Sequence, residues 1–581
     1  MKINYRVLQF SFFALLIVIL LGGCIPHVKE IPQYDYDKMN AVTKRIHKKI
    51  ECFLQSCIEE KDPVKISRFT RIDSVLVDEK NDHVDIYMNR FFSRIPFREE
   101  NTRKIYAAIR DEIGWRDNKF SFTVYTTNNR IEELIPNFYR SDTASYDKSR
   151  LAKIKGKIPP VVQNINKKWD ITQGLYHKHI ALWHSHGWYY NSRLDRWEWQ
   201  RARLFQSVED LGSMSYTLPY IVPMLENAGA YVFLPRERDL QTHEVVIDND
   251  SYMELNPNYI EKTAGDSIGW HTGFSPGFSI GNPPYDSLVN PFSLGSYRWV
   301  KANIRPTAEI NWIPNIPEEG HYAVYISYAS STSRVTDAHY TVYHTGGKTE
   351  FLVNQQMGGG TWIYLGAFIF RKGLHPDSGK VVLTNESKEV GKNLSADAVR
   401  FGGGMGNIIR EGKISGRPRY EEAARYYMQY AGMPDTLVYT LSASENDYKD
   451  DYQGRGEWVN YLKGAPFGPN RNRMEKGLGI PIDLSLAFHT DAGISPSDTV
   501  IGTLSIFCTL DAETLLVFPD SVSRFANRDF ADILQSEIVE DIRKLHDPSW
   551  SRRELLDSDY SEVTFQGESV SKNTLSIRLL G

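Results

Sequence analysis

Two histidines two residues apart follow an apolar run and precede a glycine in residues 180–188, Ile-Ala-Leu-Trp-His-Ser-His-Gly-Trp. Such a run indicates a buried strand, and the glycine indicates a turn at its carboxyl end. Residues 482–493 have the same form, with His489 after the apolar run. Because open α/β sheets build their sites at the carboxyl ends of strands, we expect both strands to lie in one sheet and their imidazoles to share a metal ion.

An acidic residue lies between these two stretches on a predicted helix. Residues 200–226 have the apolar spacing of a helix that carries Glu209, and residues 228–234 then indicate a strand, which is the order of a βαβ unit. A catalytic zinc takes three nitrogen or oxygen ligands and keeps a fourth position for water, and two histidines with one carboxylate are a common set. Bound zinc lowers the pKa of water to about 7 and polarises a carbonyl, which permits amide hydrolysis near neutral pH.

The alternative is that the same residues have purely structural roles. A histidine at the end of a strand is often part of the core, and a glutamate on a helix usually faces solvent. The occurrence of two strand–histidine–turn endings in one chain favours the metal site.

The order and the flanks of these residues resemble zinc-dependent N-acetylmuramoyl-L-alanine amidases. The resemblance covers residues 160–250 and 405–565 and includes Gly-Ala-Tyr-Val-Phe-Leu-Pro-Arg-Glu-Arg-Asp at 229–239 and Asp-Leu-Ser-Leu-Ala-Phe-His at 483–489. It implies that Zn²⁺ is bound by His186, Glu209 and His489, with His184 as the rival for the first position. The implied reaction is hydrolysis of the amide between the lactyl group of N-acetylmuramic acid and L-alanine in peptidoglycan.

The resemblance also implies a second glutamate on a late strand, acting as general base and acid on the zinc-bound water. The end of the chain departs from this pattern, because residues 560–581 hold no glutamate inside an apolar strand. Glu568 is the catalytic residue only by default. A truncated or frame-shifted end would account for the difference, and loss of such a base typically costs about 10²–10⁴-fold in rate.

A different pattern fills residues 299–403. Short alternating strands separated by Gly-Gly turns at 346–347 and 358–360 predict an antiparallel β-sandwich. The segment resembles the golvesin C-terminal-like domain in Trp-Ile-Pro at 312–314, Gly-His-Tyr-Ala-Val-Tyr at 320–325, Asn-Gln-Gln at 354–356, Trp-Ile-Tyr-Leu-Gly at 362–366 and Ala-Asp-Ala-Val-Arg-Phe at 396–401.

Modules related to this domain occur in xanthan lyases, so the sandwich is expected either to bind glycan or to shape the cleft of the surrounding domain. Within it, Asp397 and Arg400 are either ligands of a bound group or a buried structural pair.

The first residues form a predicted export signal. A basic start, an apolar run at 10–21 and Leu-Gly-Gly-Cys at 21–24 are typical of a signal peptide and resemble a bacterial lipobox with Cys24 as the lipidated residue. An uncleaved anchor is the alternative. A lipidated Cys24 predicts a lipid-anchored protein of the bacterial cell envelope. Because no acidic cluster follows Cys24, we expect it to stay at the outer membrane and to face the periplasm.

The predicted fold class is α/β: an amidase-like open sheet with flanking helices, interrupted by an antiparallel β-sandwich and preceded by a small α+β domain. The predicted segments are a signal peptide (1–24), the small α+β domain (25–140), a linker (141–160), the first half of the amidase-like domain (161–250), a connecting segment (251–298), the sandwich (299–403), the second half of the amidase-like domain (404–565) and an atypical tail (566–581). In the second half, residues 436–441 indicate a strand. Residues 446–458 indicate a polar loop, either a substrate-facing rim or a solvated charge run.

The composition argues against one class of partner and leaves two functions open. A net charge of −4 over 581 residues leaves no basic excess for nucleic acid. The aromatic content of 12% suits sandwich cores or glycan-binding surfaces. Cys52 and Cys57 either pair in an oxidising compartment or stay free on different faces of a helix. Two hypotheses remain: a zinc amidase of peptidoglycan, and a glycan-binding lipoprotein with an inactive metal domain.

Overall fold

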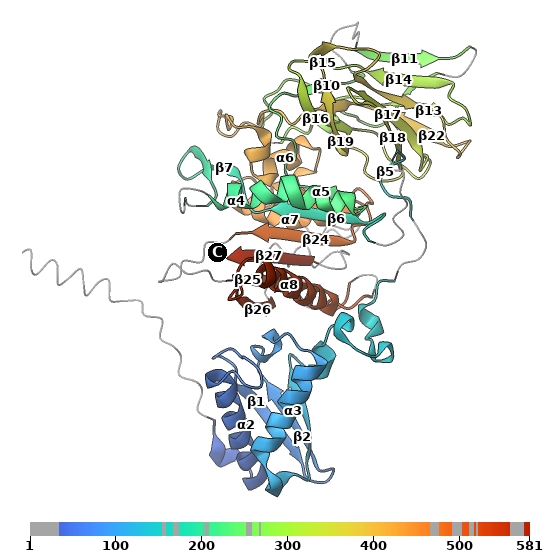
Figure 1. Ribbon diagram of the computed structural model, residues 1–581. Helices are drawn as coiled ribbons and strands as arrows, with labels where there is room; N and C mark the ends of the chain where they lie inside the picture. Colours follow the sequence, from blue (N-terminus) through green and yellow to red (C-terminus); the bar gives the residue numbers. More distant parts are fainter. Residues whose placement is uncertain are drawn as a thin grey trace, which may run out of the picture. The chain divides into compact units, whose positions relative to one another are not determined.

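The computed structural model describes residues 34–153, 158–166, 174–201, 203, 208–250, 258–265, 269–286, 288–464, 476–490, 502–510, 516–518, 521–557 and 574–580 (Figure 1). The chain divides into two compact units, and in its described part the first comprises residues 34–92 and 103–130. Among the described residues, no helix combines the length and apolar character that a membrane span requires. Cys24 lies outside the described residues.

The first unit is a small α+β structure. Its elements are α2 (Ala41–Glu59), β1 (Ile72–Asp78), β2 (His83–Met88), most of α3 (Glu99–Ile113), β3 (Ser121–Thr126) and β4 (Asn129–Arg130). The strands form one sheet in the order β1-β2-β3-β4, in which only β2 and β3 are parallel. Cys52 and Cys57 both lie on α2 and are unpaired, the first exposed and the second buried. Their spacing of five residues places them on different faces of the helix.

The second unit contains the two strands that end in histidine. A six-stranded sheet has the order β26-β25-β27-β24-β6-β9. Its strands are β6 (His179–His184), β9 (Tyr231–Phe233), β24 (Leu484–His489), β25 (Gly502–Phe507), β26 (Arg552–Asp557) and β27 (Thr574–Leu580). Strands β27, β24, β6 and β9 are parallel, and β25 runs antiparallel to β27. Every residue of β6 is buried, as expected for a strand covered on both faces.

Helices cover both faces of this sheet. Helices α5 (Val222–Asn227) and α8 (Phe525–Leu545) pack in one apolar cluster with Ile180, Leu182, Leu486 and Phe488. The alternate residues Ala181, Trp183 and Ala487 belong to another cluster with α6 (Ala424–Tyr430) and α7 (Asp447–Lys463). The structure is therefore a mixed α/β protein rich in strands, as predicted at that level, although the sheet by itself identifies no family.

Two predictions for the second half of this domain are wrong. Residues 446–458 belong to helix α7 rather than a loop, and Asn446 caps the helix by accepting a hydrogen bond from the Lys449 amide. Most of the charges that indicated a loop are buried, and some of them are paired, as in Arg455–Asp451 at 3.0 Å. The predicted strand at 436–441 is a helical turn (Asp435–Tyr439) whose Val438 packs against α7. In both places tertiary packing overrides the local pattern.

The sandwich consists of two larger antiparallel sheets, which confirms the predicted architecture. One sheet has the order β10-β23-β16-β19 and the other β11-β14-β21-β17-β18-β5. Their strands are β5 (Val162–Asn164), β10 (Val245–Ile247), β11 (Tyr259–Thr263), β14 (Ala308–Trp312), β16 (Gly320–Ile326), β17 (Ala338–His344), β18 (Gly347–Val353), β19 (Ile363–Phe370), β21 (Lys380–Thr384) and β23 (Val399–Phe401). A smaller sheet joins β12 (His271–Thr272), β13 (Arg298–Lys301) and β22 (Asn393–Ala396).

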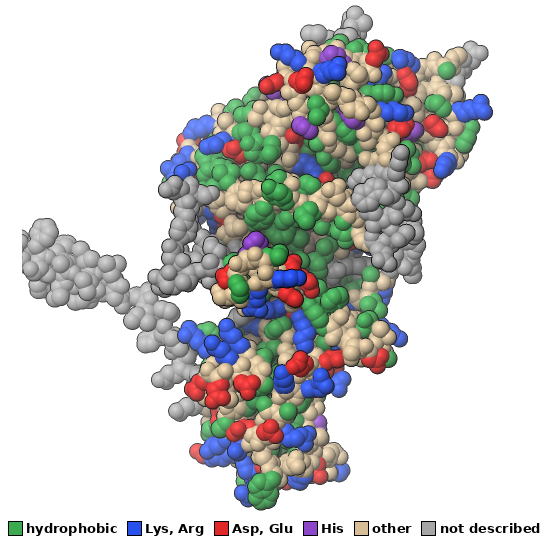
Figure 2. Space-filling model, in the orientation of Figure 1, with side chains coloured by type: hydrophobic (Ala, Val, Ile, Leu, Met, Phe, Trp, Pro, Cys, Tyr) green, Lys and Arg blue, Asp and Glu red, His purple; other side chains and the backbone are tan. Residues whose placement is uncertain are grey.

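Strands β5, β10 and β11 come from outside 299–403, so the sandwich is larger than predicted. They pair along edges that would otherwise be exposed. On the face of the sandwich shown in Figure 2, Lys and Arg side chains are intermixed with Asp and Glu.

Residues 141–150, predicted as linker, belong to the second unit. Two short 3-10 turns occupy Thr143–Ser145 and Lys148–Arg150. Buried Arg150 donates hydrogen bonds to Asp529 on α8 at 2.9 and 3.2 Å, which holds the segment against the helix.

Candidate metal centre

The carboxyl ends of β6 and β24 meet because the two strands are parallel neighbours in register. Phe488 pairs with His184, and the amide of Ser185 donates to the carbonyl of Phe488 at 2.7 Å. The chain then turns, so His186 lies just beyond β6 while His489 is the last residue of β24. Glu209 is the first residue of α4 (Glu209–Tyr216).

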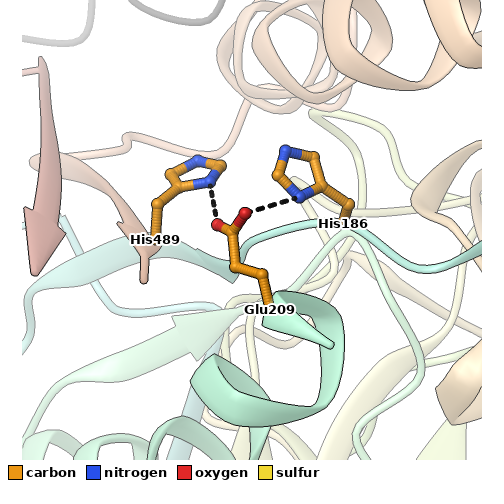
Figure 3. Close-up of side chains that lie close together, drawn as sticks. All are labelled: His186, Glu209 and His489. Atoms are coloured by element: carbon orange, nitrogen blue, oxygen red, sulfur yellow. Dashed lines mark hydrogen bonds and ion pairs between the residues drawn. The ribbon is translucent and has the colours of Figure 1, made fainter. Parts of the chain in front are cut away.

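These elements bring three potential ligands together, as Figure 3 shows. Glu209 reaches between the two imidazoles, with its Oε1 3.1 Å from Nδ1 of His489 and its Oε2 3.7 Å from Nδ1 of His186. One ligand atom from each residue lies within 4.8 Å of the others, and both histidines are buried. Within the described part of the chain, no other set of three or more His, Cys, Asp and Glu side chains has this geometry. Two nitrogens and one carboxylate oxygen suit zinc.

His184, the rival ligand, is not part of this cluster. Its side chain is fully buried and makes no hydrogen bond to the residues that the structure describes. Burial, together with the neighbouring Arg236 and Arg455 guanidinium groups, holds the pKa of His184 well below its usual range. His184 is therefore a neutral core residue.

Two buried arginines hold the turn that carries His186. Arg236 donates from Nη1 to the carbonyls of His184 and His186 and from Nε to the carbonyl of Glu422. Arg455 donates to the carbonyl of Ser185 at 2.7 Å. These bonds satisfy the carbonyls of the turn and hold the backbone from which the imidazole of His186 projects.

Sequence reasoning missed Arg201, which lies at the cluster. Its Nη2 donates to Nε2 of His186 at 3.1 Å, its Nε lies 3.3 Å from Oε2 of Glu209, and its Nη1 donates to the hydroxyl of Tyr448 at 3.0 Å. An arginine stays protonated and cannot accept a hydrogen bond, so it places a fixed positive charge beside the ligands. No spacing in the sequence points to it, because contact depends on how the chain folds after β7 (Trp188–Asn191) and β8 (Arg196–Trp199).

Asp210 is the second residue that was missed. Its carboxyl is fully buried, makes no hydrogen bond to any described residue, and lies 4.0 Å from Nδ1 of His186. Burial raises the pKa of this carboxyl to about 7.

The general base expected from the sequence has no structural description, because Glu568 lies outside the described residues. On the neighbouring strand β27, Arg578 is the register partner of His489. Residues 574–580 of that strand include no glutamate.

Comparisons with known proteins concern the sandwich. Residues 293–403 match the golvesin C-terminal domain. A xanthan lyase of Bacillus sp. (strain GL1) is 31% identical over 96 residues, which are 16% of this chain and 10% of the relative. The prediction of a golvesin C-terminal domain is confirmed, and part of the chain is homologous to a xanthan lyase. The chain spans about a tenth of that relative's length.

Solved structures give weaker likenesses. The Paenibacillus xanthan lyase is 23% identical, with a TM-score of 0.21, 27% of this chain covered and 13% of that chain. A family 35 carbohydrate-binding module from Clostridium thermocellum is 14% identical, with a TM-score of 0.17, 28% of this chain covered and 98% of that chain. No amidase family is among the matches, so the chemistry of the metal centre rests on its geometry.

Proposed function

We propose that this protein binds a glycan of the bacterial cell envelope through its golvesin C-terminal domain and carries a zinc-dependent hydrolase beside it. Two observations support glycan binding: residues 293–403 match the golvesin C-terminal domain, and 96 residues of the chain are 31% identical to a xanthan lyase. The observation that supports the hydrolase is the convergence of His186, Glu209 and His489.

The proposed reaction is cleavage of the N-acetylmuramoyl-L-alanine amide of peptidoglycan. Bound zinc would supply an acidified water and a polarised carbonyl. His186, Glu209 and His489 would hold the ion, with the carboxylate of Glu209 lying between the two imidazoles. The guanidinium of Arg201, which donates to the hydroxyl of Tyr448, would supply positive charge beside the proposed ligands, and such a charge stabilises an amide oxygen that becomes negative during attack.

A second candidate function is glycan binding without hydrolysis. It is favoured by the absence of a glutamate from residues 574–580, the strand next to His489, since a missing base removes the proton transfer that amide cleavage needs. The matches of the sandwich also concern a carbohydrate-active protein rather than an amidase.

Metal analysis of purified full-length protein tests the zinc site. We expect one zinc per chain, and its loss in His186→Ala and in His489→Ala. The matched control is His243→Ala, because His243 is a partly exposed histidine that pairs with Glu318. Zinc content unchanged by either ligand substitution would rule out the shared site.

Peptide release from peptidoglycan by the zinc-loaded protein separates the two functions. Release that a chelator abolishes supports the amidase. Release that survives the chelator excludes the zinc mechanism, whereas bound zinc without release supports the binding function.

A further inference from the structure

A groove lies where the sandwich meets the six-stranded sheet, on elements that the metal centre does not use. It has a volume of about 750 Å³ and is lined on one side by β5 and β19 and on the other by the turn before β6 and the end of α5. The volume falls in the usual range for ligand sites, which favour junctions between substructures.

The charges inside the groove are already neutralised. Lys178 forms an ion pair with Asp483 at 3.0 Å, and Glu226 pairs with Arg238 at 2.7 Å. A charged ligand would compete with these existing pairs, so the groove suits a neutral one.

Aromatic and amide residues also line the groove. Tyr176 is 37% exposed, and the groove is also lined by Phe368 and by Gln163, Asn164 and Asn227, which carry amide side chains. An aromatic face takes the apolar face of a sugar ring, while a primary amide both donates and accepts hydrogen bonds. An acetamido group can exchange two such bonds with one amide side chain.

The two walls are held together before any ligand binds. Gln163 of the sandwich donates to the hydroxyl of Tyr176 at 3.2 Å. On the opposite side, the hydroxyl of Tyr231 donates to the carbonyl of Tyr364 at 2.7 Å, and the guanidinium of Arg238 lies 3.8 Å from the ring of Tyr364. A site held in this way pays a smaller ordering cost when a ligand binds.

A peptide strand fits this groove less well than a sugar chain. Strand β5 is only three residues long. In β19, Val324 pairs with Gly366 and Tyr325 with Tyr364, so Leu365 is a bulged residue. Bulged and short edges are poor templates for an added strand.

We propose that this groove binds a neutral, N-acetylated glycan strand. The inference rests on the proposed glycan binding and assigns it a surface shared by the sandwich and the sheet domain, separate from the metal centre.

Calorimetric titration of the full-length protein with chitohexaose tests the proposal. We expect binding, and a loss of affinity of about tenfold or more in Tyr176→Ala, which removes the exposed ring. Ala367→Arg should weaken binding similarly, because Ala367 is exposed on β19 and a long side chain there fills the groove. The control is Phe274→Ala, a 96% exposed aromatic that does not line the groove.

Affinity retained in both groove variants, with unfolding midpoints unchanged, would overturn the proposal. So would binding of a peptidoglycan stem peptide that both variants abolish, since it would indicate strand addition. Wild-type protein that binds zinc but does not bind chitohexaose would also overturn the groove proposal, without contradicting the proposed zinc centre.

Discussion

At the scale of single residues, the proposed metal centre depends on Gly187 as well as on its proposed ligands. A Cβ atom at this position would lie 2.6 Å from the amide nitrogen of Ala423 and 2.7 Å from the carbonyl oxygen of Glu422. Both contacts are with backbone atoms, which cannot rotate away as a side chain can. The absence of a side chain therefore permits the close approach that places His186.

We predict that Gly187→Ala lowers zinc affinity about tenfold or more, although the residue is no ligand, because displaced supports of metal ligands typically cost 10–100-fold. Zinc affinity by competition with a chelating dye measures it. The matched control is Gly212→Ala in α4, where the added Cβ meets its nearest atom at 3.5 Å and an alanine favours the helix. Equal zinc affinity in Gly187→Ala and wild type would contradict this role for the glycine.

At the scale of elements, a buried ion pair joins the sandwich to the sheet domain. Arg400 on β23 donates to Glu237, which follows β9, at 2.6 Å, and both side chains are fully buried. Glu237 also accepts hydrogen bonds from the hydroxyl of Tyr325 and from two backbone amides. Of the two roles considered for Arg400, the structural pair is the one observed, although its partner is Glu237. Asp397 instead accepts hydrogen bonds from Ser327 and the Phe278 amide.

Removing one partner of the Arg400–Glu237 pair should lower the free energy of unfolding more than removing both. We expect Arg400→Met to lower the free energy of unfolding by about 3–5 kcal/mol, because it leaves the Glu237 carboxylate buried without its cation. The double variant Arg400→Met with Glu237→Gln should recover part of this loss. Denaturant unfolding of the four proteins in the cycle measures both effects.

An exposed pair provides the control for this cycle. Lys262 and Glu309 lie 2.9 Å apart on β11 and β14, with side chains 58% and 35% exposed, so Lys262→Met should cost less than about 1 kcal/mol. If the double variant at the buried site loses as much free energy of unfolding as the two single variants together, the two charges do not interact.

At the scale of the whole molecule, the proposed metal centre joins distant parts of the chain. His186 and His489 are about 300 residues apart, with the sandwich inserted between them. All three proposed ligands belong to the second compact unit. A ligand that binds only the folded state stabilises it by about 2.7 kcal/mol at a hundred times its Kd.

Zinc should therefore slow amide hydrogen exchange in one unit only. We expect slower exchange in β6, in the first turn of α4 and in β24, with no change in β1, β2 and β3 of the other unit. Mass spectrometry of full-length protein with and without zinc measures the difference, and His489→Ala should abolish it. Slowing that persists in His489→Ala would place the bound zinc elsewhere.

The sequence alone determined what depends on local patterning. Apolar runs ending in His186 and His489 indicated strands with imidazoles at their carboxyl ends, and alternation over 299–403 indicated the sandwich. Helix α7 shows the limit of such reasoning. Its charges resemble a solvated loop in the sequence, yet Asp451 and Arg455 neutralise one another inside the protein, and local composition does not reveal a partner.

Only the tertiary structure decided which residues share the site. The choice of His186 over His184 follows from the turn that Arg236 and Arg455 hold, and the presence of Arg201 follows from the path of the chain after β8. The pairing of β6 with β24 across about 300 residues likewise depends on packing between distant segments. Propensity and spacing act over a few residues, whereas a metal centre of this kind depends on contacts between segments that only folding brings together.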